Sequence, residues 1–133
     1  MSQNIIQITR GDTFDFNITV YDELYGAYYY GTQPGDKIVF RILYPHQSFF
    51  DVVEANENNP ENKEIALFSQ TVELLDNTPN DDCVFYLEHE DTLKLLPGVY
   101  YYTVKLIRDP APGETAKRQV LTIIEKTKFI VND

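Results

Sequence analysis

The chain lacks several features that would point to particular classes of protein. It has a single cysteine, Cys83, so no intrachain disulfide can form, and its CVFYL setting predicts a buried small hydrophobic residue. It has no tryptophan, no apolar run long enough to span a membrane, and no basic and apolar N-terminal stretch of the kind that directs secretion. We therefore expect a protein made in a reducing cytoplasm that folds without a disulfide.

Positive charge is also scarce, because 11 Lys and Arg stand against 21 Asp and Glu, for a net charge of -10. This balance argues against nucleic-acid binding, which requires clustered cations for the phosphates. The charges are unevenly placed: acids dominate from Asp51 to Asp91, and cations dominate from Lys105 to Lys128. Such asymmetry can orient copies of a chain against each other, although a solvated acidic face that aids solubility is the simpler interpretation.

The dominant hydrophobic period is two, which is the period of β-strands. In TFDFNITVY, Phe14, Phe16 and Ile18 share one face, and in KIVFRIL, Ile38 and Phe40 do the same. The expected strands are 4–10, 13–21, 37–43, 64–75, 83–88, 99–107 and 117–125, with a last short piece at 127–131 that extends the sheet or reaches a neighbour.

The helical signal is weak, and turn residues separate the strands. Asp91-Thr92 is expected to cap a single turn that runs to Leu96 and is closed by Pro97-Gly98. Two long insertions, 22–36 and 44–63, interrupt the pattern, and DPAPGET at 109–115 is typical of a hairpin end. The sequence therefore predicts one all-β domain over residues 1–133, an immunoglobulin-like β-sandwich of about seven to eight antiparallel strands with two long loops.

The tyrosines of GVYYYTVKLIRD raise the question of a stacking platform for a ligand. Alternation places Tyr100 and Tyr102 on the face that carries Val104, so we expect both in the core with their hydroxyls on backbone partners, and only Tyr101 outside. The insertions differ, because their aromatic residues lie outside any clean alternation. We predict partner-binding residues there: Tyr28, Tyr29, Tyr30, Phe49 and Phe50.

Signs of catalysis and metal binding are poor. The chain has no G-x-S-x-G nucleophile elbow, and its carboxylates are scattered, so we expect no enzymatic activity and no cofactor. Zinc needs three or four His or Cys ligands, and only His46, His89 and Cys83 exist, at no useful spacing. The DNTPNDD stretch from Asp76 to Asp82 is rich in oxygen ligands but lacks the EF-hand order, so an ordinary turn is favoured over calcium binding.

Two separated segments carry a resemblance to a known family. ITRGDTFDFNITVYD places an R-G-D-T turn at Arg10 to Thr13 before a strand, and FYLEHEDTLKLLPGVYYYTVKLIRD places Asp91-Thr92 before a turn and a core strand. With the later KRQVLTIIE, these segments resemble the N-terminal immunoglobulin-like domain of phage baseplate upper proteins and related small virion proteins. The chain departs from that pattern in its two insertions, both longer than usual.

The resemblance implies a non-enzymatic bacteriophage structural protein that is assembled in the host cytoplasm and resides in the virion. It implies docking on the baseplate, tail or capsid surface and packing against identical copies or neighbouring virion proteins, with neither nucleic acid nor membrane as a partner. An alternative is a carbohydrate- or receptor-binding module of a surface protein, since exposed aromatic residues suit sugar stacking.

Overall fold

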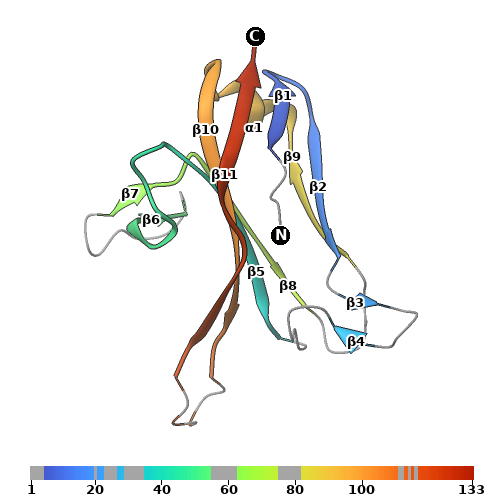
Figure 1. The fold of residues 1–133 in the computed structure, drawn as a ribbon, viewed down its shortest axis with the longest axis vertical. Helices are drawn as coiled ribbons and strands as arrows, with labels where there is room; N and C mark the ends of the chain where they lie inside the picture. Colours follow the sequence, from blue (N-terminus) through green and yellow to red (C-terminus); the bar gives the residue numbers. More distant parts are fainter. Residues whose placement is uncertain are drawn as a thin grey trace.

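The structure is a computed structural model that describes residues 5–19, 21–22, 27–28, 35–54, 63–74, 82–110, 113, 115 and 117–133. Strands make up most of it (Figure 1). The seven longer strands are β1 (Ile6–Thr9), β2 (Phe14–Thr19), β5 (Lys37–Leu43), β8 (Phe68–Glu73), β9 (Asp82–Leu87), β10 (Gly98–Arg108) and β11 (Gln119–Asn132). Four strands of two residues complete the set: β3 (Tyr21–Asp22), β4 (Ala27–Tyr28), β6 (Val52–Val53) and β7 (Glu64–Ile65).

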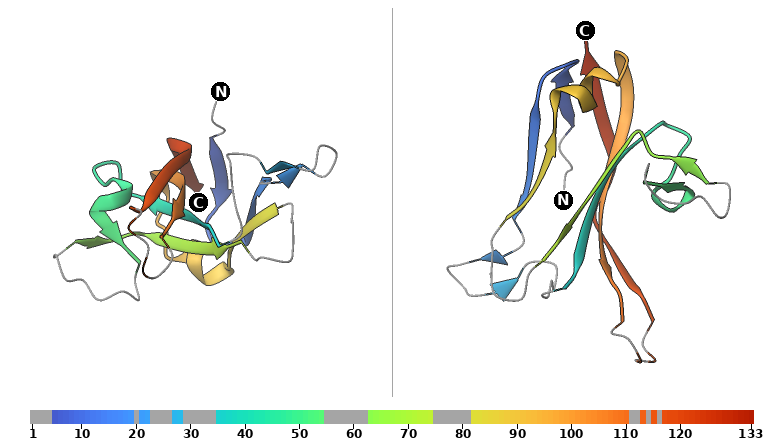
Figure 2. Two further views of the ribbon diagram at one scale, coloured as in Figure 1. Left: turned by 90° about the horizontal axis from the view of Figure 1, so that it is seen from below. Right: turned by 180° about the vertical axis from the view of Figure 1, so that it is seen from behind.

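Five strands form one mixed sheet in the order β1-β11-β10-β5-β8, and β2 pairs with β9 in a second sheet. The two sheets enclose a single core, because Ile18 of β2 and Phe85 of β9 belong to the same buried cluster as Phe40 of β5 (Figure 2). The all-β prediction is therefore confirmed. The expectation of antiparallel pairing throughout is wrong in two places. β1 runs parallel to β11, with Ile6 opposite Phe129, and the short strands β6 and β7 are also parallel.

The core follows the alternation read from the sequence. Ile38, Phe40 and Ile42 are fully buried on the inner face of β5. Tyr100 and Tyr102 also point inward, and the Tyr100 hydroxyl donates a hydrogen bond of 2.5 Å to the carbonyl of Leu96. Burial raises the pKa of both phenols. The stretch with three tyrosines is thus mainly a core strand, as predicted.

The last strand differs from its prediction. The sequence suggests separate strands at 117–125 and 127–131, whereas β11 is one strand of 14 residues. Its register against β10 shifts between Tyr102 and Val104 and again between Val104 and Lys105, so β11 carries extra residues there. Such bulges bend a strand without ending it, which explains why the alternation breaks while the pairing continues.

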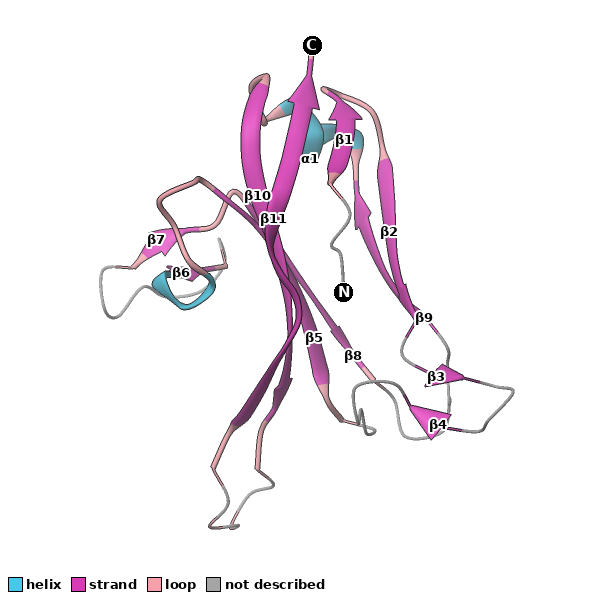
Figure 3. Ribbon diagram, in the orientation of Figure 1, coloured by secondary structure: helices cyan, strands magenta, loops and turns pink. Residues whose placement is uncertain are grey.

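Helix α1 (His89–Leu93) lies where β10 begins (Figure 3). The expected cap at Asp91-Thr92 is wrong by three residues, because Glu88 is the N-cap. The Glu88 side chain accepts from the backbone N–H of Asp91, and the Asp91 carboxylate accepts from the N–H of Glu88 at 2.9 Å. Asp91 is therefore the third helical residue of a reciprocal capping box.

The turn that precedes β2 is fixed to α1. Gly11 has φ 89°, a conformation that favours glycine, as the sequence predicts for this turn. Arg10 Nε donates to the carbonyl of Leu93 at 2.9 Å, Thr92 Oγ1 donates to the carbonyl of Asp12 at 2.7 Å, and the His89 ring nitrogen lies 2.5 Å from the carbonyl of Gly11. Asp12 takes part through its backbone carbonyl.

Candidate functional site: a pocket on the outer face of the sheet

The first half of the second insertion folds back on the outer face of the five-stranded sheet. Arg41 of β5 organises this return, although a charged residue in the middle of a strand is usually exposed. Its side chain is 9% exposed, and its Nη1 donates to the carbonyls of Phe49 at 2.7 Å and Val52 at 3.2 Å. The guanidinium also lies 4.4 Å from the centre of the Phe49 ring. The sequence predicted a long surface loop here; residues 44–54 are instead packed on the sheet.

A second small core forms beneath this insertion from Leu43, Val52 and Ala66. The short parallel pair β6–β7 closes it, and the N–H of Ala66 donates to the carbonyl of Val53 at 3.0 Å. The five-stranded sheet is therefore covered on both faces at β5. The return of the insertion also places the 3-10 helix η2 (Phe49–Asp51) over the β10–β11 hairpin.

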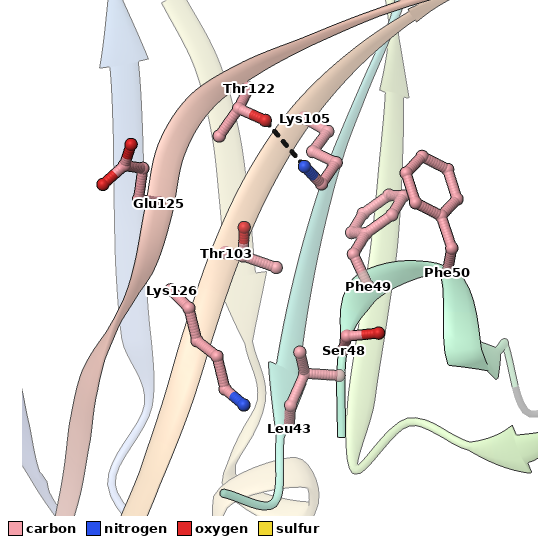
Figure 4. Close-up of a pocket in the computed structure, with 9 residues that line it drawn as sticks. All are labelled: Leu43, Ser48, Phe49, Phe50, Thr103, Lys105, Thr122, Glu125 and Lys126. Carbon is pink, nitrogen blue, oxygen red and sulfur yellow. Dashed lines mark hydrogen bonds between the residues drawn. The ribbon is translucent and has the colours of Figure 1, made fainter. Parts of the chain in front are cut away.

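Between η2 and the hairpin lies a pocket of about 290 Å³ (Figure 4). Its lining comes from three segments: Leu43 of β5, Ser48, Phe49 and Phe50 around η2, and Thr103, Lys105, Thr122, Glu125 and Lys126 of the hairpin. This volume is close to the lower limit for small-ligand pockets, roughly 300 Å³. The pocket can hold a side chain or a small ligand.

The two adjacent phenylalanines have different roles. Phe49 is 4% exposed and is packed against Arg41, whereas Phe50 is 47% exposed at the pocket edge. Their rings meet edge to face at a centroid distance of 4.9 Å, and Lys105 Nζ lies 5.6 Å from the centre of each ring. Of the predicted pair, Phe50 therefore exposes its ring at the pocket edge and Phe49 supports that ring from below.

Most polar groups of the pocket are already hydrogen-bonded within the chain. The Ser48 hydroxyl donates to Asp51 at 2.5 Å, the Thr103 hydroxyl to the carbonyl of Ile124 at 2.9 Å, and Lys105 Nζ to Thr122 Oγ1 at 2.6 Å. Within the described residues, the Glu125 carboxylate has no such partner. The pocket therefore exposes mainly apolar surface and a cation, because the Glu125 carboxylate points away from Lys105 and Phe50 (Figure 4).

Lys126 ties the insertion to β11. Its Nζ donates to the carbonyls of Pro45 and Gln47, each at 2.6 Å, and lies 5.3 Å from the centre of the Tyr101 ring.

A second set of contacts within the insertion converges on Glu64. Gln47 is buried and donates to the Glu64 carboxylate at 2.7 Å, and His46 lies 3.3 Å from the same carboxylate. These hydrogen bonds, with that from Gln47 the largest cause, lower the pKa of Glu64.

The other predicted site residues are only partly placed. The backbone of Tyr28 pairs with Tyr21 in the β3–β4 ribbon, whereas Tyr29 and Tyr30 lie outside the described residues. The Asp76–Asp82 stretch, considered for calcium, also lies outside them except for Asp82.

The sequence analysis did not identify three cations that shape the pocket: Arg41, Lys105 and Lys126. Only Arg41 carried a signal, since it is a cation between the apolar residues Phe40 and Ile42.

The part of the chain that the structure describes contains no group of three or more His, Cys, Asp or Glu residues placed to hold a metal ion. Among the same residues, no helix is long and apolar enough to cross a membrane. In comparisons with known proteins, no family model, curated protein or solved structure matches the chain.

Proposed function

We propose that the chain is a non-enzymatic structural protein of a bacteriophage particle, with an immunoglobulin-like β-sandwich that docks on the baseplate, tail or capsid surface. The observation that carries the proposal is the contact between the two segments that suggested it. The Arg10–Thr13 turn and the segment around Asp91-Thr92 are about 80 residues apart, yet three contacts from Arg10, His89 and Thr92 join them. The resemblance therefore rests on residues that act as one structural unit.

The strand order supports the immunoglobulin-like assignment. If β2, β5, β9, β10 and β11 are taken as strands B, C, E, F and G, then C, F and G lie in one sheet and B and E in the other. This is the division found in immunoglobulin domains, where an additional strand next to C, here β8, extends the sheet in the variable type.

The pocket on the outer face is the docking surface that the geometry favours. It combines the exposed Phe50 ring with Lys105, and its hydroxyls are used within the chain. Such a surface suits an apolar side chain beside an anionic one, which a protein partner supplies. Tyr28, Tyr29 and Tyr30 remain predicted contacts of the same kind on the first insertion.

Mass spectrometry of purified particles from the source phage tests this function. The chain is expected in the particle fraction at a copy number that matches a symmetric component. Phe50→Ala should reduce its incorporation into particles while its unfolding temperature stays nearly unchanged. A chain that is abundant in infected cells but absent from particles would contradict the proposal.

Carbohydrate or receptor binding is the second candidate, and the exposed ring of Phe50 is the observation in its favour. The hydroxyl groups already used within the chain leave few partners for a sugar. Glycan-array binding that is lost in Phe50→Ala would favour this candidate over docking in the virion.

A further inference from the structure

One edge of the five-stranded sheet is open over part of its length. β11 pairs with β10 on one side, whereas on the other side β1 covers only Phe129 to Asn132. Within the described residues, no strand pairs with the outer side of Gln119–Ile124, which we call the β11 edge. Unpaired backbone N–H and C=O groups along such an edge can accept a further strand.

The composition of the β11 edge suits strand pairing. Its sequence, QVLTII, has no charge, no proline and no glycine, and it is rich in β-branched residues. Val120 and Leu121 point to opposite faces of the strand, and each is more than two-fifths exposed. Natural edges are usually protected by lysines and bulges. Here Lys126, Lys128 and one of the two bulges lie beyond this segment, and the other bulge lies at its end, between Thr122 and Ile124.

The charges that flank the β11 edge complement each other when two copies are antiparallel. Lys117 lies four positions before Leu121 and Glu125 lies four positions after it. Both side chains are exposed, and neither has an ionic partner among the described residues. Figure 4 shows Glu125 directed away from β10, toward the outer side of β11. Two antiparallel β11 edges centred on Leu121 therefore bring the end that carries Lys117 in each copy to the end that carries Glu125 in the other, and the extra β11 residue between Thr122 and Ile124 shifts the exact register by one position.

We propose that two copies of this chain pair through their β11 edges, antiparallel and about a two-fold axis, so that their five-stranded sheets become one continuous sheet. Because the same edge is used on both copies, the contact closes as a dimer and does not propagate into a fibre. The proposal does not depend on the virion role: the dimer is a property of the purified chain, and presence in particles is a separate observation.

Sedimentation velocity with a charge-swap series tests the dimer. The wild-type chain is expected to shift from monomer to dimer as its concentration is raised through the micromolar range. Lys117→Glu and Glu125→Lys each place like charges across the axis twice, so each should weaken dimerisation by about tenfold. The double variant restores opposite charges, and its dissociation constant should return to near the wild-type value.

Amide hydrogen exchange distinguishes edge pairing from docking of faces. Edge pairing should slow exchange at alternate residues of the β11 edge as the concentration rises, while the amides of η2 at the pocket stay unchanged. Circular dichroism melts of the four proteins check that the substitutions leave the fold intact, since both positions are exposed.

Several outcomes would overturn the proposal. These are a wild-type chain that stays monomeric at high micromolar concentration, a species larger than a dimer, or a double variant as weak as its parents. Dimerisation with protection confined to η2 would assign the contact to the pocket, and pairing of the β11 edge only in the presence of another virion protein would assign it to a different partner.

Discussion

The two faces of the five-stranded sheet are both covered at β5, but by different physical means. On the inner face, Phe40 is fully buried and has the rings of Phe85 and Tyr102 at centroid distances of 5.4 and 5.7 Å. On the outer face, the insertion is held by polar contacts from Arg41 and Lys126 to backbone carbonyls. The inner face is a continuous apolar core, and the outer face is a small layer fixed at a few points.

The two faces should respond differently when one contact is lost. An apolar core is stabilised by area and close packing, so a loss at one position is felt by the whole domain. A layer fixed by a few hydrogen bonds can open locally while the rest of the domain stays folded. The pocket that we propose as a docking surface, with Phe50 at its edge, can therefore change without destabilising the core.

The largest effect is expected from Phe40→Ala. Removing this ring leaves a cavity among Phe16, Phe68, Phe85 and Tyr102, whose ring centres lie within 6.0 Å of it. The free energy of unfolding should fall by about 3–5 kcal/mol, measured by chemical denaturation followed by circular dichroism. Phe50→Ala, which removes an exposed ring, is the matched control and should cost less than about 1 kcal/mol. Equal losses would contradict the assignment of the two faces.

Arg41→Lys should have the next largest effect, and it should be local. Lysine keeps the charge, but its single nitrogen cannot replace both Nη1, which donates to Phe49 and Val52, and Nε, which donates to Ser69. At least one of these acceptors then lacks its donor, so the free energy of unfolding should fall by about 2 kcal/mol. Hydrogen exchange should accelerate at residues 49–53 and stay slow in β10. Arg118→Lys, at an exposed ion pair with Asp109, is the control and should change little.

Lys126→Met should release the first part of the insertion. The hydrogen bonds to the carbonyls of Pro45 and Gln47 are lost, but water can hydrate these carbonyls. We therefore expect the free energy of unfolding to fall by about 1 kcal/mol. Amide chemical shifts at 46–48 should move toward random-coil values. Lys128→Met on the same strand, where no such tether is seen, should leave them in place. If both variants shift these signals alike, Lys126 is not the tether.

The smallest effect on stability is expected from lowering the pH. The pKa of Glu64 is lowered, so the folded state favours its carboxylate, and this contribution is present above the unfolded pKa and lost as pH falls through the folded one. Residues 44–48 should loosen in acid while the inner core stays intact. The side-chain amide signal of Gln47 in an NMR titration reports the change. Glu64→Gln should remove the acid transition, and a transition that persists in this variant would assign it to another group.

Local patterns predicted the inner face well. Alternation alone placed Ile38, Phe40, Tyr100 and Tyr102 in the core and left Tyr101 on the other face of β10. The same rule was insufficient where the chain departs from regular pairing. The bulges in β11 shift the period, so one strand looked like two, and the capping box of α1 depends on which acid is the N-cap, which composition does not decide.

The candidate site was predicted only in part. Phe49 and Phe50 were recognised as unusual, yet their division into a supporting ring and an exposed ring depends on Arg41, which lies eight residues away on another element. Lys126 contacts residues about 80 positions earlier in the chain. Such contacts leave no periodic trace in the sequence, so Lys105 and Lys126 were seen only as part of a basic stretch.

The sequence by itself determined the longer strands other than β11, the inner core and the glycine turn before β2, because side-chain alternation and the left-handed conformation of Gly11 are local properties of the chain. Only the tertiary structure decided the parallel pairing of β1, the return of the second insertion onto β5, the pocket beside Phe50 and the stretch of β11 that no strand covers among the described residues. These features depend on contacts between distant residues, whose free energy appears only when the sheets have come together.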